Sequence, residues 1–176
     1  MMTLWPRGWN GLILSSCSLA LVGLGCAGIA RSDSLTFPVD EPSRTEPVTA
    51  AMKVDRDTVR AEERFEVLVR VRIAAGQHIY GTKKIAGPFT PTSLDLILPA
   101  DVEPVGKWVA PRPTKTKTGD RIYTDSVLFR HSLKVRLNTP PVLLSIRGEL
   151  RCQACDEESC WPPGKIGVST TVSVAP

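Results

Sequence analysis

The feature that most constrains the fold is an alternation of apolar and mostly charged residues between positions 65 and 73. Successive side chains of a β-strand point to opposite faces, so a period of two predicts a strand with one face in the core and the other in solvent. A helix would instead show an apolar period near 3.6. The residues of the predicted inward face are Phe65, Val67, Val69, Val71 and Ile73.

Weaker apolar runs predict further strands along the rest of the chain. These runs lie at 52–59, 93–98, 122–129, 133–137, 142–152 and 166–174. Glycine, proline and asparagine separate them, and no apolar stripe of helical period intervenes. The pattern is typical of an all-β, antiparallel β-sandwich. The stretch 111–118 has no large apolar residue to bury, so we interpret it as a long exposed loop.

Length and charge limit the classes of protein that remain. The chain has 176 residues and a formal net charge of +4. We expect a single folded domain over residues 51–176. The charge is too small and too dispersed to predict nucleic-acid binding.

The N-terminal residues have the layout of an export signal. Arg7 precedes an uncharged apolar run that ends in small residues, which predicts a signal peptide over residues 1–30. Cys26 lies where a lipoprotein signal would be cleaved and lipidated, whereas ordinary cleavage after Ala30 and an uncleaved membrane anchor are the alternatives. Residues 31–50 mix proline, serine and charge, and we interpret them as a disordered tether. The protein is thus expected to be exported, into the periplasm or as a lipid-anchored envelope protein.

Three cysteines cluster near the C-terminus. Along 142–152 the apolar residues share one parity, and Cys152 falls on that inward face. Cys155 and Cys160 then lie on the connection to the next predicted strand, at an end of the sandwich. A disulfide between two cysteines so close in sequence would stabilise the fold by only about 2 kcal/mol. Because this contribution to stability is small, we favour a redox pair over a structural bridge.

The same loop carries acidic residues at positions 156–158. Negative neighbours disfavour a thiolate, so we expect the pair to react when the thiolate of a partner protein attacks it.

Other interpretations of the cysteines have less support. Cys152 and Cys155 are spaced as a CxxC, but the helix that follows such a motif in thioredoxins is missing, and so is the histidine of a haem site. His78 or His131 could join the cysteines at a metal, yet the paired spacing of zinc sites is absent. We therefore predict neither metal nor other cofactor. His131 lies in a predicted strand and is interpreted as a surface side chain.

Residues 150–163 resemble the Y-Q-A-C-x4-C-x-P-P signature of a known family, and residues 76–81 resemble its G-x-H-I-Y strand. The family is that of the N-terminal periplasmic domain of the thiol:disulfide interchange protein DsbD. The resemblance covers roughly residues 50–174, and it implies an immunoglobulin-like β-sandwich whose two cysteines pass electrons between partners. Those partners would be a thioredoxin-like redox protein and a membrane electron donor, and we expect any donor to be a separate protein.

The resemblance also assigns roles to single residues. Cys160 would form mixed disulfides and Cys155 would resolve them, in an oxidoreductase-type exchange. The residues that would flank this pair are His78, Tyr80, Tyr123, Trp161 and Pro162.

Two departures from the family pattern keep an alternative open. Cys152 replaces the usual aromatic residue and could reshuffle with Cys155. The aromatic loop that covers the family's disulfide should fall at 115–123, where only Tyr123 could replace it. The alternative function is a non-catalytic immunoglobulin-like binding module that keeps the disulfide as a structural bridge.

Overall fold

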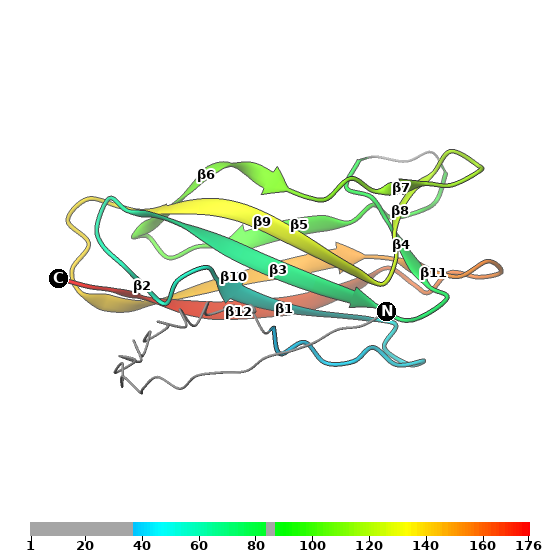
Figure 1. The fold of residues 1–176 in the computed structure, drawn as a ribbon, viewed down its shortest axis with the longest axis horizontal. Helices are drawn as coiled ribbons and strands as arrows, with labels where there is room; N and C mark the ends of the chain where they lie inside the picture. Colours follow the sequence, from blue (N-terminus) through cyan, green and yellow to red (C-terminus); the bar gives the residue numbers. More distant parts are fainter. Residues whose placement is uncertain (1–36, 84–86) are drawn as a thin grey trace, which may run out of the picture. The chain divides into compact units, whose positions relative to one another are not determined.

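The structure, a computed structural model, describes residues 37–83 and 87–176. Within them every regular element is a β-strand, which confirms the all-β prediction (Figure 1). No helix that could cross a membrane occurs in this part of the chain. The predicted signal peptide, Cys26 and residues 31–36 of the predicted tether lie outside the described residues.

The first large sheet contains the strand predicted from the alternation. Its strands, in spatial order, are β1 (Val48–Val54), β3 (Arg64–Ile73), β9 (Ser126–Val135) and β6 (Val102–Val109), all antiparallel to their neighbours. Strand β9 is continuous where the sequence predicted two shorter strands. Strand β6 was not predicted, and it forms one edge of the sheet.

The second large sheet carries the strand that leads into the cysteine loop. Its order is β2 (Thr58–Val59), β12 (Gly164–Val174), β10 (Val142–Cys152) and β5 (Ser93–Ile97). Strands β10 and β12 pair antiparallel from Val142↔Val174 to Cys152↔Gly164. The expectation that the cysteine loop connects two neighbouring strands is therefore confirmed.

A third, small sheet lies at one end of the domain, on the right in Figure 1. Its order is β11 (Ala154–Cys155), β4 (His78–Tyr80), β8 (Arg121–Tyr123) and β7 (Thr114–Lys115). The stretch 111–118, predicted to be a long exposed loop, is mostly exposed, but β7 within it pairs with β8 in a hairpin. Backbone pairing, which needs no apolar side chain, explains how this polar stretch is ordered.

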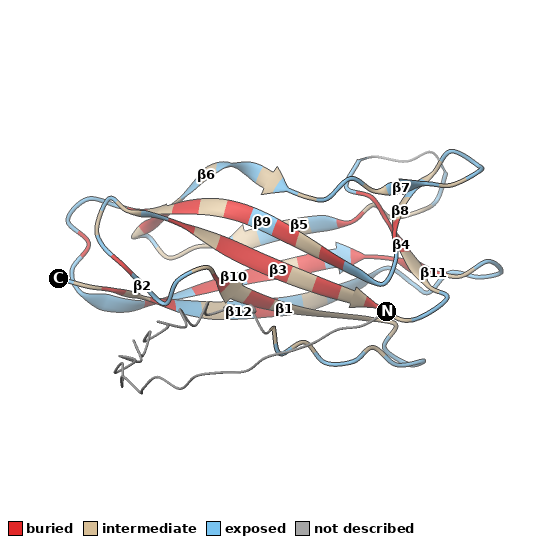
Figure 2. Cartoon of the chain, in the orientation of Figure 1, coloured by how far each residue is buried: buried red, intermediate tan, exposed pale blue. Residues whose placement is uncertain are grey.

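The core lies between the two large sheets, and Figure 2 shows it as the buried bands along β3, β9, β10 and β12. Its members include Phe65, Phe129 and Ile146, each at most 2% exposed. His131 shares the parity of Phe129 on β9, so the prediction of a surface histidine was wrong: it is 6% exposed. The Trp108 ring from edge strand β6 meets it at 5.0 Å between ring centroids.

Residues ahead of β1 contact the outer face of the first sheet. The guanidinium of Arg70 lies 4.8 Å from the centroid of the Phe37 ring, and Arg72 forms an ion pair with Glu41. The Thr49 hydroxyl donates to the Asp40 carbonyl oxygen at 2.6 Å. Regular structure thus begins at Val48, and residues just before it pack on the domain.

Candidate functional site

Cys155 and Cys160 form a disulfide, with 2.04 Å between the sulfur atoms and 4.0 Å between the Cα atoms. They also face each other in an isolated β-bridge at the end of the domain. Cys155 belongs to β11 and is 1% exposed, whereas Cys160 is exposed. One half of the bond is therefore buried in the third sheet, and the other half belongs to the surface.

Asp156 organises the loop between the two cysteines. Its Oδ1 accepts hydrogen bonds from the backbone N–H groups of Glu158 and Ser159 at 2.9 and 2.7 Å. Its Oδ2 accepts from Gln77 Nε2 at 3.1 Å, which joins the loop to the turn before β4. The backbone donors of Glu158 and Ser159 hold the pKa of Asp156 below its usual range, since they stabilise the carboxylate.

Cys160 opens onto a groove of about 610 Å³. Trp161 and Pro162 line the groove beside it, and residues 74–77 and Arg44 form other parts of the wall. Trp161 is 39% exposed, which leaves part of its indole available to a docked molecule. The groove gives an incoming thiol group an approach to Cys160 that does not require the sandwich to open.

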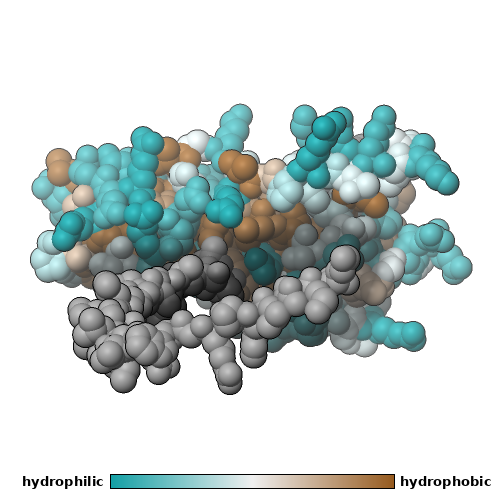
Figure 3. Space-filling view, viewed as in Figure 1, coloured by the Kyte–Doolittle hydropathy of each residue, from teal (hydrophilic) through white to brown (hydrophobic). Residues whose placement is uncertain are grey.

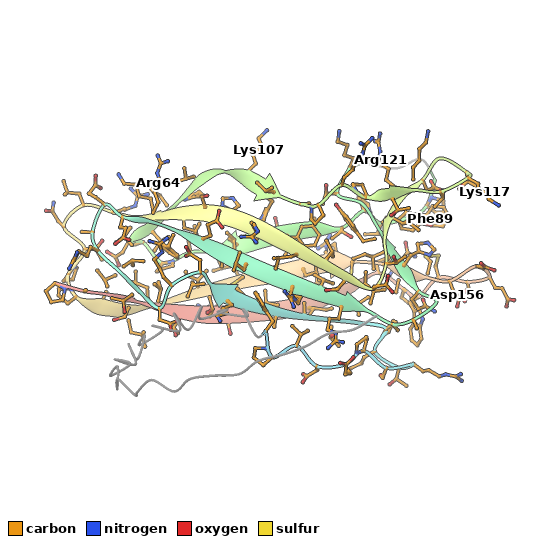
Figure 4. All side chains as sticks on the ribbon, in the orientation of Figure 1. Arg64, Phe89, Lys107, Lys117, Arg121 and Asp156 are labelled. Carbon is orange, nitrogen blue, oxygen red and sulfur yellow. A yellow bond between two sulfur atoms is a disulfide. The ribbon has the colours of Figure 1, made fainter. Side chains whose placement is uncertain are left out.

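A row of rings begins beside Cys155 and runs along β4. His78 on β4 pairs with Cys155 on β11. The Tyr80 ring meets the His78 ring edge-on with 5.4 Å between centroids, and Phe89 stacks on Tyr80 at 4.9 Å. Figure 4 labels Phe89 and Asp156 at this end of the domain. His78, predicted from the sequence, is therefore brought next to Cys155, whereas Tyr80, also predicted, contacts His78, and Phe89 extends the row.

Gln153 connects the two loops that surround the disulfide. Its Oε1 accepts from the backbone N–H of Thr90 at 2.9 Å, and its Nε2 donates to the Trp161 carbonyl oxygen at 3.1 Å. The Trp161 N–H in turn donates to the Ala154 carbonyl oxygen at 2.8 Å. A side chain that is only 9% exposed thus fixes the loop of Phe89 and the residue after Cys160 relative to β11.

Burial controls the ionisation of the neighbouring side chains. Partial burial lowers the pKa of His78, and the carboxylates of Asp120 and Asp156 act in the opposite direction. The imidazole is consequently neutral at pH 7. Burial also raises the pKa of the Cys152 thiol to about 11. Cys152 is 4% exposed, as the strand parity predicted, and is neither bonded nor ionised at neutral pH.

Tyr123 does not lie with the other predicted flanking residues. It pairs with Ile79, so its ring shares the core face of the small sheet, where it meets Phe129 edge-on at 5.7 Å. Its hydroxyl donates to the Pro111 carbonyl oxygen at 3.0 Å. Tyr123, the residue of 115–123 that could replace the covering aromatic, therefore lies on the opposite face of the small sheet from His78.

Sequence reasoning missed Phe89, Gln153 and Gln77. An apolar aromatic between Gly87-Pro88 and Pro91, in a segment otherwise composed of turn residues, was the available signal for Phe89. Gln153 is the glutamine of the Y-Q-A-C signature, but no role followed from it, and nothing comparable marked Gln77, whose partner Asp156 lies far away in sequence. Among residues 37–83 and 87–176, no group of three or more histidine, cysteine or acidic side chains is arranged to hold a metal ion.

Fold and loop together define the class of protein: an all-β sandwich domain with a disulfide at one end, buried on one side and exposed on the other. The sequence matches the family described as "Thiol:disulfide interchange protein DsbD, N-terminal" over residues 43–171, and the chain belongs to this family. The predicted all-β sandwich is confirmed by the two large sheets. No match was found among curated proteins.

The solved structures to which this chain is similar include two N-terminal domains. The N-terminal domain of DsbD from Neisseria meningitidis, in its reduced form, is 19% identical with a TM-score of 0.41, and the match covers 62% of this chain and 82% of that one. The N-terminal periplasmic domain of ScsB from Proteus mirabilis is 13% identical with a TM-score of 0.47. That match covers 78% of this chain and 49% of the ScsB chain.

Proposed function

We propose that this protein is a thiol:disulfide exchange relay of the cell envelope, which passes electrons through Cys155 and Cys160 between thioredoxin-like partners. The observation that carries the proposal is the asymmetry of the disulfide: Cys160 is exposed in a groove, and Cys155 is 1% exposed. Membership of the DsbD N-terminal family supports it. The envelope location rests on the apolar N-terminus and on the family, and lipidation of Cys26 would add a membrane tether.

The exposed half of the bond sets the order of the chemical steps. A partner thiolate attacks the sulfur of Cys160, a bond forms between partner and Cys160, and Cys155 leaves as a thiolate that takes up a proton. The partner's second thiol, after losing its proton, attacks the partner's own sulfur in this mixed disulfide and releases Cys160 as a thiolate. The partner is oxidised by two electrons and the pair is reduced by two. The reverse sequence, started by Cys160, reduces an acceptor disulfide.

The buried environment of Cys155 supports its role as the resolving residue. Its neighbour His78 is neutral at pH 7, so no cation stabilises a long-lived Cys155 thiolate. Asp156, held ionised in the same loop, adds a negative charge. Both features disfavour the Cys155 thiolate, which favours the disulfide over the dithiol at equilibrium, and they leave activation of the exchange to the partner's own thiolate.

Native-state reduction tests the proposal directly. We expect dithiothreitol to open one disulfide without change in the circular dichroism spectrum. One thiol, that of exposed Cys160, should then react rapidly with a thiol reagent, while the buried thiols of Cys155 and Cys152 should react much more slowly. The thiolate of Cys160 in the Cys155→Ser variant should form a mixed disulfide with a thioredoxin-fold probe whose reactive cysteine is activated as a thionitrobenzoate disulfide, with release of thionitrobenzoate. The matched Cys160→Ser variant should react at least about tenfold more slowly, because its remaining Cys155 is buried.

The alternative, a non-catalytic module with a structural disulfide, predicts other results. Its support is the hydrogen-bonded Asp156 turn, which holds the loop closed. A bond that resists dithiothreitol until the protein unfolds, or a reduction potential below about −300 mV, would favour this alternative and contradict the relay.

A further inference from the structure

Cationic side chains gather on the hairpin side of the small sheet, and we call this set the basic surface: Lys83, Arg112, Lys115, Lys117 and Arg121. All five are exposed. Figure 4 shows Arg121 and Lys117 projecting from the β7–β8 region, and Figure 3 shows the hydrophilic side chains that stand out there. Between residues 107 and 123 the sequence holds one acidic residue, Asp120.

The basic surface is not neutralised by the described part of the chain. None of its five cations forms an ion pair with a described residue, whereas cations of the first large sheet do: Arg72 pairs with Glu41, Arg130 with Glu66 and Lys134 with Glu62. The Asp120 carboxylate accepts from Thr118 Oγ1 at 2.8 Å, within the hairpin turn itself. The positive charge of this surface is thus available to attract another molecule.

The surface also has a concave part. A groove of about 360 Å³ is lined by Lys83, Arg112 and Arg121, with Trp108 and Tyr123 among its other walls. No carboxylate is among the described residues that line it. Arginine side chains bind carboxylates through two parallel hydrogen bonds, so two arginines at one groove fit acidic side chains of a protein.

The basic surface belongs to the same small sheet as the disulfide. Cys160 forms a β-bridge with Cys155, and Cys155 pairs with His78 on β4. Three residues after His78, the Gly81 N–H donates a hydrogen bond to the Arg121 carbonyl oxygen on β8. Strand spacing and rise along β4 place Arg121 about 15–20 Å from Cys160. A standard protein interface buries about 800 Å² per partner and is thus about 30 Å across. One partner can therefore cover both places.

This end of the domain carries negative charge in one place and positive charge in another. The loop of Cys160 carries Asp156, Glu157 and Glu158, and the hairpin carries the basic surface. The carboxylates of Asp120 and Asp156, one from each place, both act on the His78 imidazole between them. A partner over Cys160 would meet negative charge on one side and positive charge on the other, which orients it.

We propose that the basic surface docks an acidic face of the protein that exchanges thiols with Cys155 and Cys160. This inference rests on the proposed function and specifies the chemistry of the partner. Attraction between the two faces raises the rate of encounter and turns the partner's cysteine toward Cys160.

The probe is a synthetic peptide with an N-terminal cysteine, six glycine and serine spacer residues and four glutamates. The extended spacer spans about 20 Å, which matches the separation of Cys160 and the basic surface. A companion peptide carries four glutamines instead. The measured quantity is the ratio of the rates at which the two peptides form a mixed disulfide with the oxidised protein, in about 0.01 M and about 1 M salt.

Two charge-reversed proteins provide the comparison. Arg112→Glu/Arg121→Glu changes the basic surface, and Arg60→Glu/Arg64→Glu makes the same change in charge at exposed arginines outside the small sheet. Figure 4 shows Arg64 and Arg121 toward opposite ends of the domain. In low salt the wild-type ratio should be at least about three and should approach one in high salt. It should fall to one or below in R112E/R121E and persist in R60E/R64E.

A wild-type ratio of one, or an equal loss in both variants, would overturn the inference. The inference would also be overturned if the ratio is one and the protein sediments with phosphatidylglycerol vesicles, with only R112E/R121E abolishing this sedimentation. That result would assign the surface to membrane binding. Reduction by uncharged dithiothreitol distinguishes failure of this inference from failure of the proposed function. If it opens the disulfide at equal rates in all three proteins while the ratio is one, only the acidic partner is refuted; if it fails to open the native bond, the proposed function is refuted as well.

Discussion

At the scale of single residues, Asp156 restrains the loop that the disulfide closes. Its carboxylate accepts hydrogen bonds from two backbone N–H groups of the loop and from Gln77, and these bonds keep its pKa low. It therefore holds Cys160 close to Cys155 and places a negative charge where a thiolate must approach. Both effects slow the opening of the bond.

Replacing Asp156 should accelerate reduction. Asp156→Ala removes the charge and the acceptor oxygens together, and we expect dithiothreitol to reduce the variant about fivefold or more faster than the wild type. Glu157→Ala removes a charge from the same loop, but no side-chain hydrogen bond of Glu157 occurs among the described residues, so its rate should change by less than about twofold. Stopped-flow thiol release measures both rates. Equal rates in the two variants would show that the Asp156 turn does not restrain the bond.

At the scale of elements, β10 sets the position of the site through close packing. Gly148 lies midway along this strand, buried between β5 and β12. A Cβ there would lie 3.0 Å from the Asp95 carbonyl oxygen and 3.0 Å from Met52 Cε. Gly167, on the partner strand, has no atom within 4 Å of the equivalent position. The two glycines thus differ in whether the sandwich tolerates a side chain.

The pair Gly148→Ala and Gly167→Ala tests this packing. We expect Gly148→Ala to destabilise the fold by about 1–3 kcal/mol, because the added methyl group displaces strand β5 or Met52. The unfolding temperature should fall by roughly 3–10 °C. Gly167→Ala should lie within about 1 kcal/mol of the wild type or be more stable, since it loses less backbone entropy on folding. Equal melting curves would contradict the close approach at β10.

The elements also explain which predictions from the sequence succeeded. Strands β3, β10 and β12 alternate clearly, because each buries one face against the core. Strand β6 was missed because Pro104 and Gly106 interrupt its pattern, features that an edge strand tolerates and that protect it from pairing further. The disulfide followed from local spacing. The contacts of Cys155 with His78, and of Gln153 with Thr90, depend on pairing between distant segments, which no local pattern encodes.

At the scale of the whole molecule, the core contacts and the disulfide are separate. The core cluster includes Phe65, Phe129 and Leu150 of the large sheets together with Ile79, Tyr123 and Ala154 of the small sheet, but neither Cys155 nor Cys160. The disulfide closes a short loop at one end, between residues five apart in sequence. Both oxidation states of a relay must remain folded, so this separation of stability from chemistry is what the proposed function requires.

The stability of the reduced protein tests that separation. A loop this short contributes only about 2 kcal/mol in the chain-entropy account, so reduction should lower the unfolding temperature by about 5–10 °C and leave the transition cooperative. Calorimetry of the oxidised protein and of the protein in dithiothreitol measures the shift. The Cys155→Ala/Cys160→Ala variant should unfold near the temperature of the reduced form and should not respond to the reductant. A fall of more than about 20 °C, or the loss of a cooperative transition, would mean that the sandwich depends on the bridge, because the small loop alone cannot supply that much free energy. The dithiol state of a relay would then not be a folded state of this protein.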